Sequence, residues 1–225
     1  MQKEHRPVEL QEHATKHPKQ DFQVERIAFF SDAVFAIAIT LLVIEFKIPK
    51  VTKDNSYAEV WQEVVALKYK FFSLILSFAL IANYWMRHHL LFKHIHNYNR
   101  KVVMANLLCL LPIIFFPFTT AFFYDSLNNE NILVIPYRLF VLNNVLAGGT
   151  AYFFYWIVIR RFGDLSYPME KKDRYEFEFR LPVMAISFLL VLILSFIVPF
   201  EYSLIGIAPM AFLNIFNKFF KKAAR

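Results

Sequence analysis

A carboxylate, Asp32, stands at the beginning of a long apolar stretch that runs to residue 44 and contains a single hydroxyl, Thr40. A carboxylate at the start of a membrane-length helix is costly unless it is paired or faces water, so such a residue usually belongs to a functional site. A helix with a charged residue at its foot, one hydroxyl near its middle and bulky aliphatic residues between them suits the wall of a narrow ion pathway.

The rest of the chain provides the elements that such a helix needs around it. Of the 225 residues 57% are hydrophobic, including 27 phenylalanines, which is more than a water-soluble domain of this size ordinarily carries. The apolar residues fall in blocks of about 20, the length that crosses the hydrocarbon core of a membrane. These blocks lack the alternating pattern of strands, so they predict an all-α membrane protein.

The chain contains six such blocks, which together form one transmembrane domain between two polar terminal segments. We expect membrane-spanning helices at residues 29–48, 69–86, 102–123, 137–159, 181–199 and 203–219. Residues 1–25 form a cytoplasmic N-terminal segment, residues 26–220 the six-helix transmembrane domain, and residues 221–225 a basic C-terminal tail. The adjacent glycines Gly148 and Gly149 in the fourth block predict the close approach of a neighbouring helix.

The lysines and arginines favour one orientation. They gather in the N-terminal segment, after the second and fourth blocks and at the C-terminus, so the positive-inside rule places both termini in the cytoplasm and the protein in the cell membrane. The first loop, with its five lysines, argues against this orientation, but the even number of spans and the other segments outweigh it. The net charge of +7 is therefore a topology signal, and we expect no binding to nucleic acid because no basic, aromatic-rich module is present.

Several polar side chains should meet where the first three spans reach the cytoplasmic boundary. They are Arg26, Ser31, Asp32, Trp85, His88 and Asn106. We interpret these six residues as a polar clasp that fixes the first helix to its neighbours, because a carboxylate at this depth needs a partner. The alternative is an ordinary interfacial belt, in which tryptophan and basic residues lie at the level of the lipid headgroups.

At these residues the chain resembles the transmembrane protein 175 family of potassium channels, in its bacterial six-span form. The resemblance rests on Arg26-x-x-x-Phe30-Ser31-Asp32 with the apolar stretch that follows, on residues 77–92 and on residues 106–118, and it covers about residues 26–120. It implies a homotetramer that conducts potassium in preference to sodium through a central pore lined by the four first helices. It also implies a pore without a carbonyl filter, and the four glycines of the chain form no filter loop.

The resemblance further implies roles for residues on the first helix. At about 100° per residue Ala33, Ile37, Thr40 and Ile44 share a face, with Leu41 at its edge. The resemblance implies a constriction at Ile37, and rings of Leu41 and Ile44 would narrow the same lumen and exclude water from it. A hydroxyl layer at Thr40 would supply the preference for potassium. Two alternatives stay open: the aliphatic stripe packs inside the protein, or Thr40 bonds back to its own helix.

The remaining polar groups indicate neither a catalytic site nor a metal site. His88, His89, His94 and His96 have no carboxylate or cysteine nearby in sequence, so we interpret them as part of a solvated cytoplasmic loop. The single cysteine, Cys109, excludes an intrachain disulfide. No phosphate loop, nucleophile elbow or zinc-protease motif is present, so we expect no enzyme. We expect no cofactor, with potassium as the permeant ion; the expected partners are membrane lipid, monovalent cations and copies of the chain.

A secondary transporter of cations or small solutes is the alternative function. Its binding site would need broken helices near the membrane midplane and usually internal repeats. The pair Gly148-Gly149 is one possible break, but the two halves of the chain show no convincing repeat. Unitary current steps would favour a channel, whereas saturating flux without steps would favour a transporter.

Overall fold

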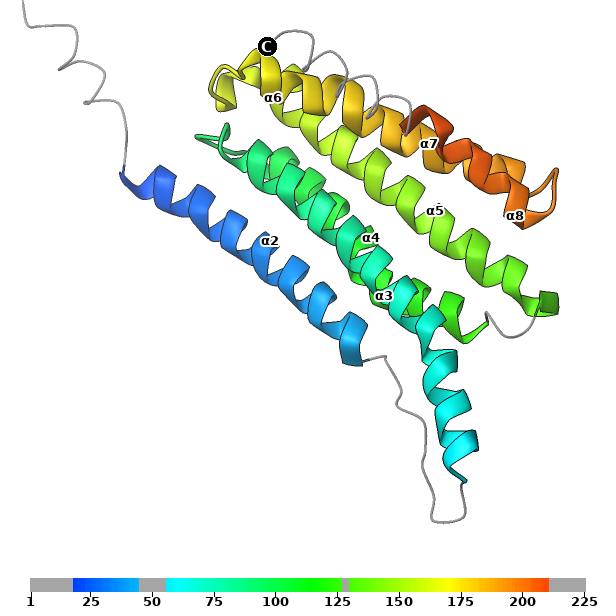
Figure 1. The fold of residues 1–225 in the computed structure, drawn as a ribbon. Helices are drawn as coiled ribbons and strands as arrows, with labels where there is room; N and C mark the ends of the chain where they lie inside the picture. The colour runs from blue at the N-terminus through cyan, green and yellow to red at the C-terminus, as the bar shows by residue number, and fades with distance from the viewer. Residues whose placement is uncertain (1–17, 45–55, 127–129, 211–225) are drawn as a thin grey trace, which may run out of the picture.

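The computed structural model describes residues 18–44, 56–126 and 130–210, which form a bundle of helices (Figure 1). The long helices are α2 (Pro18–Ile44), α3 (Tyr57–Phe92), α4 (Arg100–Asp125), α5 (Glu130–Tyr155) and α7 (Leu181–Leu194). The short elements are the π-helices η1 (Trp156–Arg161) and η3 (Glu176–Arg180), the 3₁₀ segments η2 (Gly163–Leu165) and η4 (Leu204–Ile207), and the helices α6 (Lys171–Tyr175) and α8 (Phe200–Ser203). An isolated bridge between Ile95 and Ser166 is the only extended pairing within these three ranges, so the prediction of an all-α protein is confirmed.

Four helical stretches of the described residues are long and apolar enough to cross a membrane. They are Gln23–Ile44, Arg100–Asp125, Leu133–Arg161 and Lys171–Leu194. These stretches contain most of the first, third, fourth and fifth predicted spans, and they make the chain a multi-pass membrane protein. The first helix begins at Pro18, inside the segment that we expected to precede it.

The other two predicted spans differ from the expectation. Residues 69–86 lie within α3, a helix of 36 residues. At 1.5 Å per residue α3 is about 54 Å long, well beyond the roughly 30 Å of a hydrocarbon core. Figure 1 shows its N-terminal part, in cyan, extending past the other helices. Of the last predicted span, 203–219, the described residues include only the short elements α8 and η4 and three helical residues after them, so the count of six spans stays a prediction. The tail 221–225 also lies outside the described residues.

The order of packing places α2 at one edge of the bundle. It packs against α4 and α3, α4 packs against α5, and α5 packs against α7 (Figure 1). Every long helix contributes large, fully buried side chains to the core: Phe35, Ile81, Ile113, Phe116, Phe154 and Met184. The single cysteine, Cys109 of α4, is buried in this core as a free thiol. The helix that carries the candidate pore residues is therefore attached to the subunit along one side.

Of the two adjacent glycines in α5, only Gly148 allows the close helix approach that the sequence predicted. A Cβ atom on Gly148 would lie 2.8 Å from the Cβ of Ala185 in α7, which is closer than real side chains approach, so this glycine allows the two helices to touch. Gly149 points away and has nothing within 4 Å, so it allows no close approach. A glycine that the sequence analysis did not single out, Gly206 of η4, lies closer still, with its added Cβ 2.5 Å from the backbone nitrogen of Val191.

Alanine substitutions at the two adjacent glycines should therefore have opposite effects. Gly148→Ala forces α5 and α7 apart, and overpacking of this kind costs about 1–3 kcal/mol. Gly149→Ala adds a methyl group in open space on a helix, where alanine is favoured over glycine by about 1 kcal/mol. Thermal unfolding of the two purified variants in detergent measures the difference. Equal unfolding temperatures would show that the α5–α7 contact is not tight.

Candidate functional site

The buried face of α2 holds the helix to its own subunit. Ser31, Phe35, Ala38 and Leu42 recur every three or four residues, and none is more than 3% exposed. These residues face α3 and α4, the helices against which α2 packs. Because α2 is apolar on every side, the hydrophobic periodicity of the sequence does not identify this face.

The opposite face of α2 carries the predicted pore residues. Ala33, Ile37, Thr40 and Ile44 are all exposed, Ile37 to 57% and Ile44 to 71%, and Leu41 beside them is partly exposed. The structure therefore places these residues together on a surface that points away from the core of the subunit. Within the described ranges the stripe is not covered by other helices, so it is available to contact lipid, a pore or another copy of the chain.

The hydroxyl of Thr40 bonds back to its own helix, as one of the two alternatives to a pore role predicted. Its Oγ1 donates a hydrogen bond to the carbonyl oxygen of Ile37 at 2.9 Å. A hydroxyl has one proton and two acceptor lone pairs, so this bond leaves both lone pairs of Oγ1 free. Because Thr40 is exposed, these lone pairs remain accessible from outside the subunit. The backbone bond fixes the position of the hydroxyl oxygen and leaves its acceptor lone pairs unused.

Three residues of the polar clasp form one buried chain of hydrogen bonds across three helices. His88 Nε2 lies 2.8 Å from Asn106 Oδ1, and since an amide oxygen only accepts, Nε2 carries the proton. Asn106 Nδ2 donates to Ser31 Oγ at 3.0 Å. Ser31 Oγ in turn donates to the carbonyl oxygen of Ile27 at 2.9 Å. Every donor along this chain has an acceptor, which is the condition for a stable buried polar network.

The carboxylate of the clasp has its own partner at a more exposed position. Trp85 Nε1 donates a hydrogen bond to Asp32 Oδ1 at 2.9 Å. The Trp85 side chain is 38% exposed, and Asp32 is partly exposed. Asp32 and Trp85 thus form a second link between α2 and α3, at the partly exposed surface of the subunit.

Arg26 lies apart from these two groups. Within the part of the chain that the structure describes, it makes no hydrogen bond or ion pair to another clasp residue. It lines a neighbouring groove between α2 and α4, whose wall includes Asn106. The structure therefore brings five of the six predicted clasp residues into two hydrogen-bonded groups and leaves Arg26 outside both.

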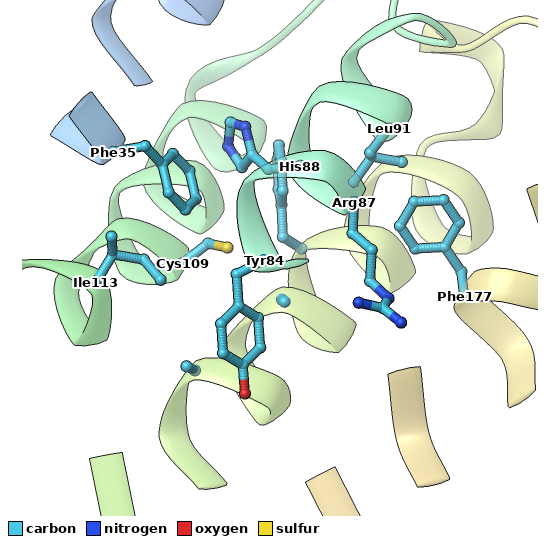
Figure 2. Close-up of a pocket in the computed structure, with 11 residues that line it drawn as sticks. Phe35, Tyr84, Arg87, His88, Leu91, Cys109, Ile113 and Phe177 are labelled. Carbon is cyan, nitrogen blue, oxygen red and sulfur yellow. The ribbon is translucent and has the colours of Figure 1, made fainter. Parts of the chain in front are cut away.

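Aromatic side chains and a small cavity surround the His88 ring. The ring centroid lies 5.3 Å from that of Phe35, 4.8 Å from Phe92 and 5.7 Å from Phe154, so residues of α2, α3 and α5 enclose it. Figure 2 shows Phe35 and Cys109 on one side of this region, with Arg87 and Phe177 on the other. His88 is 5% exposed, and its neighbours fix the orientation of the ring.

The interpretation of the histidine cluster as one solvated loop is wrong for His88 and incomplete for His94. His88 is a buried residue of α3, and His94 Nε2 lies 3.2 Å from Asp173 Oδ2, a carboxylate 79 residues away in sequence. His96 lies against the ring of Tyr167, with centroids 4.8 Å apart. No group of three or more potential metal-binding side chains occurs among the described residues.

A set of ion pairs that could not be predicted from the sequence lies at the same end of the bundle. Glu176 of η3 lies 3.7 Å from Arg87 of α3 and 2.6 Å from Arg180. Glu178, on the same short element, lies 2.6 Å from Arg160 of η1. The one signal in the sequence was Arg87 itself, because a guanidinium directly after an apolar block needs a carboxylate as its partner. The position of Arg87 in the sequence does not indicate which carboxylate this is.

The fold and the site define a multi-pass helical membrane protein with a polar clasp at one end of its first helix and an exposed aliphatic stripe along that helix. A family model described as "Endosomal/lysosomal potassium channel TMEM175" matches residues 26–117, the region in which the resemblance was expected. A potassium channel of Streptomyces collinus is 30% identical over 143 residues, which cover 64% of this chain and 68% of the relative. The chain belongs to the TMEM175 family.

Two further proteins support this assignment at different levels. A potassium channel of Chamaesiphon minutus is 36% identical over 110 residues, 49% of this chain and 53% of the relative. The crystal structure of a lysosomal potassium-selective channel TMEM175 homolog from the same organism superimposes with a TM-score of 0.67 at 23% identity, covering 86% of this chain and 95% of that one. The structural likeness extends over α5 and α7, beyond the part that the family model matches, and it concerns the fold alone.

Proposed function

We propose that this protein is a cation channel that prefers potassium, assembled from four copies of the chain around a pore lined by α2. The observation that carries the proposal is the exposed face of α2, on which Ile37, Thr40, Leu41 and Ile44 point away from the core of the subunit. The relatives from Streptomyces collinus and Chamaesiphon minutus bear the name potassium channel. An aliphatic face that is left uncovered by its own subunit can form rings around a shared axis.

In this proposal the aliphatic residues and the hydroxyl have separate tasks. Rings of Ile37, Leu41 and Ile44 close the lumen by excluding water when the pore is narrow. The oxygens of Thr40, oriented by the bond to the Ile37 carbonyl, replace part of the hydration shell of an ion. Hydroxyl oxygens are weak-field ligands, so they replace the water of potassium more readily than that of sodium, which holds its water more strongly.

The same proposal includes the orientation and location. Two loops rich in basic residues lie side by side, because the backbone nitrogen of His96 bonds to Leu165 and that of Tyr167 bonds to His94. The clasp end of α3 leads directly into this region. The positive-inside rule then puts the clasp and both termini on the cytoplasmic side of the cell membrane.

Reconstitution in liposomes tests the function directly. Vesicles that contain the purified full-length protein and an outward potassium gradient should develop a membrane potential, and planar bilayers should show unitary current steps. Flux that saturates with ion concentration and never resolves into steps would instead indicate a transporter. Protein-free vesicles and vesicles with an unrelated membrane protein of similar size serve as controls.

Removal of the Thr40 hydroxyl should lower the selectivity. Thr40→Val keeps the branched shape of the side chain, so the helix and the ring diameter change little while four coordinating oxygens disappear from the proposed tetramer. We expect the potassium-to-sodium permeability ratio, measured from bi-ionic reversal potentials, to fall toward one.

The chain offers a matched control for this substitution. Thr150 of α5 makes the same kind of backbone bond, from its Oγ1 to the Leu146 carbonyl at 2.8 Å, but lies on a helix outside the proposed pore. Thr150→Val should leave the permeability ratio unchanged. A wild-type reversal potential in the Thr40→Val channel would rule out the hydroxyl as the source of selectivity.

A further inference from the structure

A groove of about 290 Å³ lies between residues 23–30 of α2 and the beginning of α4, beside the polar clasp. Its polar lining comes from Gln23, Arg26, Tyr98 and Asn106, and its apolar lining includes Phe30, Val103 and Leu107. The hydroxyl of Tyr98 lies 3.5 Å from Gln23 Oε1, which joins the segment before α4 to α2 across the groove. The groove lies outside the proposed pore, and two of the predicted clasp residues, Arg26 and Asn106, line it.

Arg26 is the one charged residue among the described residues that line the groove. Arg26 is exposed, and among the described residues it has no ion-pair or hydrogen-bond partner. Arg100 is exposed at the first position of α4, on the same helical face as Val103 and Leu107. No carboxylate is among the described residues that line the groove. The groove therefore presents unpaired positive charge to whatever enters it.

The apolar groups follow the cations along both helices. On α2 Phe30 comes one turn after Arg26, and on α4 Leu107 comes two turns after Arg100. Phe30 is 53% exposed and Leu107 43%, and both belong to stretches that are apolar enough to cross a membrane. The cations therefore lie at the level where a phospholipid has its phosphate, and the apolar side chains lie deeper, at the level of its acyl chains.

The geometry points to a binding site for an anionic phospholipid of the cytoplasmic leaflet. The guanidinium of Arg26 has the planar fork that binds a phosphate with two hydrogen bonds. Arg100 does not line the groove, but it adds positive charge at the N-terminal end of α4. The acyl chains lie along Phe30 and Leu107. The cytoplasmic leaflet carries the anionic lipids and the negative surface potential that attract basic groups at this depth. This site goes beyond the proposed conduction of ions, and only its assignment to the cytoplasmic leaflet depends on the proposed orientation.

Native mass spectrometry of the purified full-length protein, titrated in detergent with phosphatidylglycerol or phosphatidylcholine, tests the site without any measurement of current. We expect wild-type protein to bind phosphatidylglycerol more tightly than phosphatidylcholine. Arg26→Gln should weaken phosphatidylglycerol binding about tenfold, as expected for the loss of a charged hydrogen bond. Leu107→Gln should weaken binding of the lipid by making the region of the acyl chains polar. Lys93→Gln removes an exposed cation at the same end of the bundle but outside the groove, and it should have no effect.

Three results would overturn the site. Arg26→Gln could bind phosphatidylglycerol as tightly as wild type. Inorganic phosphate could displace the lipid at equal concentration, which would mean that the apolar half contributes nothing. Arg26→Gln could also break the oligomer while no lipid is bound to wild type, which would identify the groove as a contact between copies of the chain.

Discussion

Asn106→Leu should lower the free energy of unfolding by about 1–3 kcal/mol per subunit, because it removes the central residue of a buried hydrogen-bond chain. Leucine has the same branched shape as asparagine, although a larger volume, and it leaves the Nε2 proton of His88 without its acceptor. His88 is 5% exposed and enclosed by aromatic rings, so water does not replace the lost amide oxygen. Chemical or thermal unfolding of the purified protein in detergent, followed by circular dichroism, measures the loss.

Asp32→Ala is the informative comparison for this prediction. It also removes a hydrogen-bond acceptor from the polar clasp, but the donor that it leaves behind, Trp85 Nε1, belongs to a side chain that is 38% exposed. This donor is therefore much less enclosed than His88 Nε2, and the loss of stability should be smaller than for Asn106→Leu. Equal losses in the two variants, or an Asn106→Leu protein as stable as wild type, would refute the assignment of the structural role to the buried chain.

Ile37→Asn should raise the unitary conductance several-fold, because an amide at the proposed constriction lets water fill the ring that the isoleucine side chains keep dry. The substitution changes little else in the subunit, since Ile37 is 57% exposed and faces away from the core. Single-channel recording in planar bilayers gives the conductance, and chemical cross-linking confirms that the variant still assembles.

Two companion variants separate wetting of the constriction from general damage. Ile37→Leu keeps the volume and the apolar character, so its conductance should stay close to that of wild type. Ile114→Asn places the same amide on an exposed position of α4 that lies outside the proposed pore, and it should not raise the conductance. If Ile37→Asn conducts like wild type at equal abundance, the constriction does not lie at this residue.

The choice between the two faces of α2 shows what the sequence could and could not predict. The helix, its approximate end and the shared face of Ile37 and Thr40 follow from the apolar run and the period of an α-helix. Which face packs inward does not follow, because both are apolar. The packing of Phe35 and Leu42 against neighbouring helices decides it, and this contact involves residues far away in the chain.

For the polar clasp, too, the sequence predicted one property and not another. The common depth of its residues could be predicted, since three apolar blocks end close to them. Which groups pair could not, because pairing depends on the rotation of each helix. Arg26 and Asp32 are six residues apart, which turns them by about 240° around the helix, so they point in different directions. The ion pair between Arg87 and Glu176 joins residues from different helices and depends on how the bundle closes.

The burial of Cys109 has a practical consequence for the study of this protein. It is the single cysteine of the chain, and its thiol lies inside the helical core, away from the exposed face of α2. Thiol-reactive reagents added from the water phase should therefore leave the native protein unmodified. A cysteine introduced at 33, 37, 40 or 44 becomes the sole reporter of water access at its own level, without prior removal of a native residue. Labelling rates at these four positions, compared with and without blocking cations, would trace the water-filled part of the conduction path one helical turn at a time.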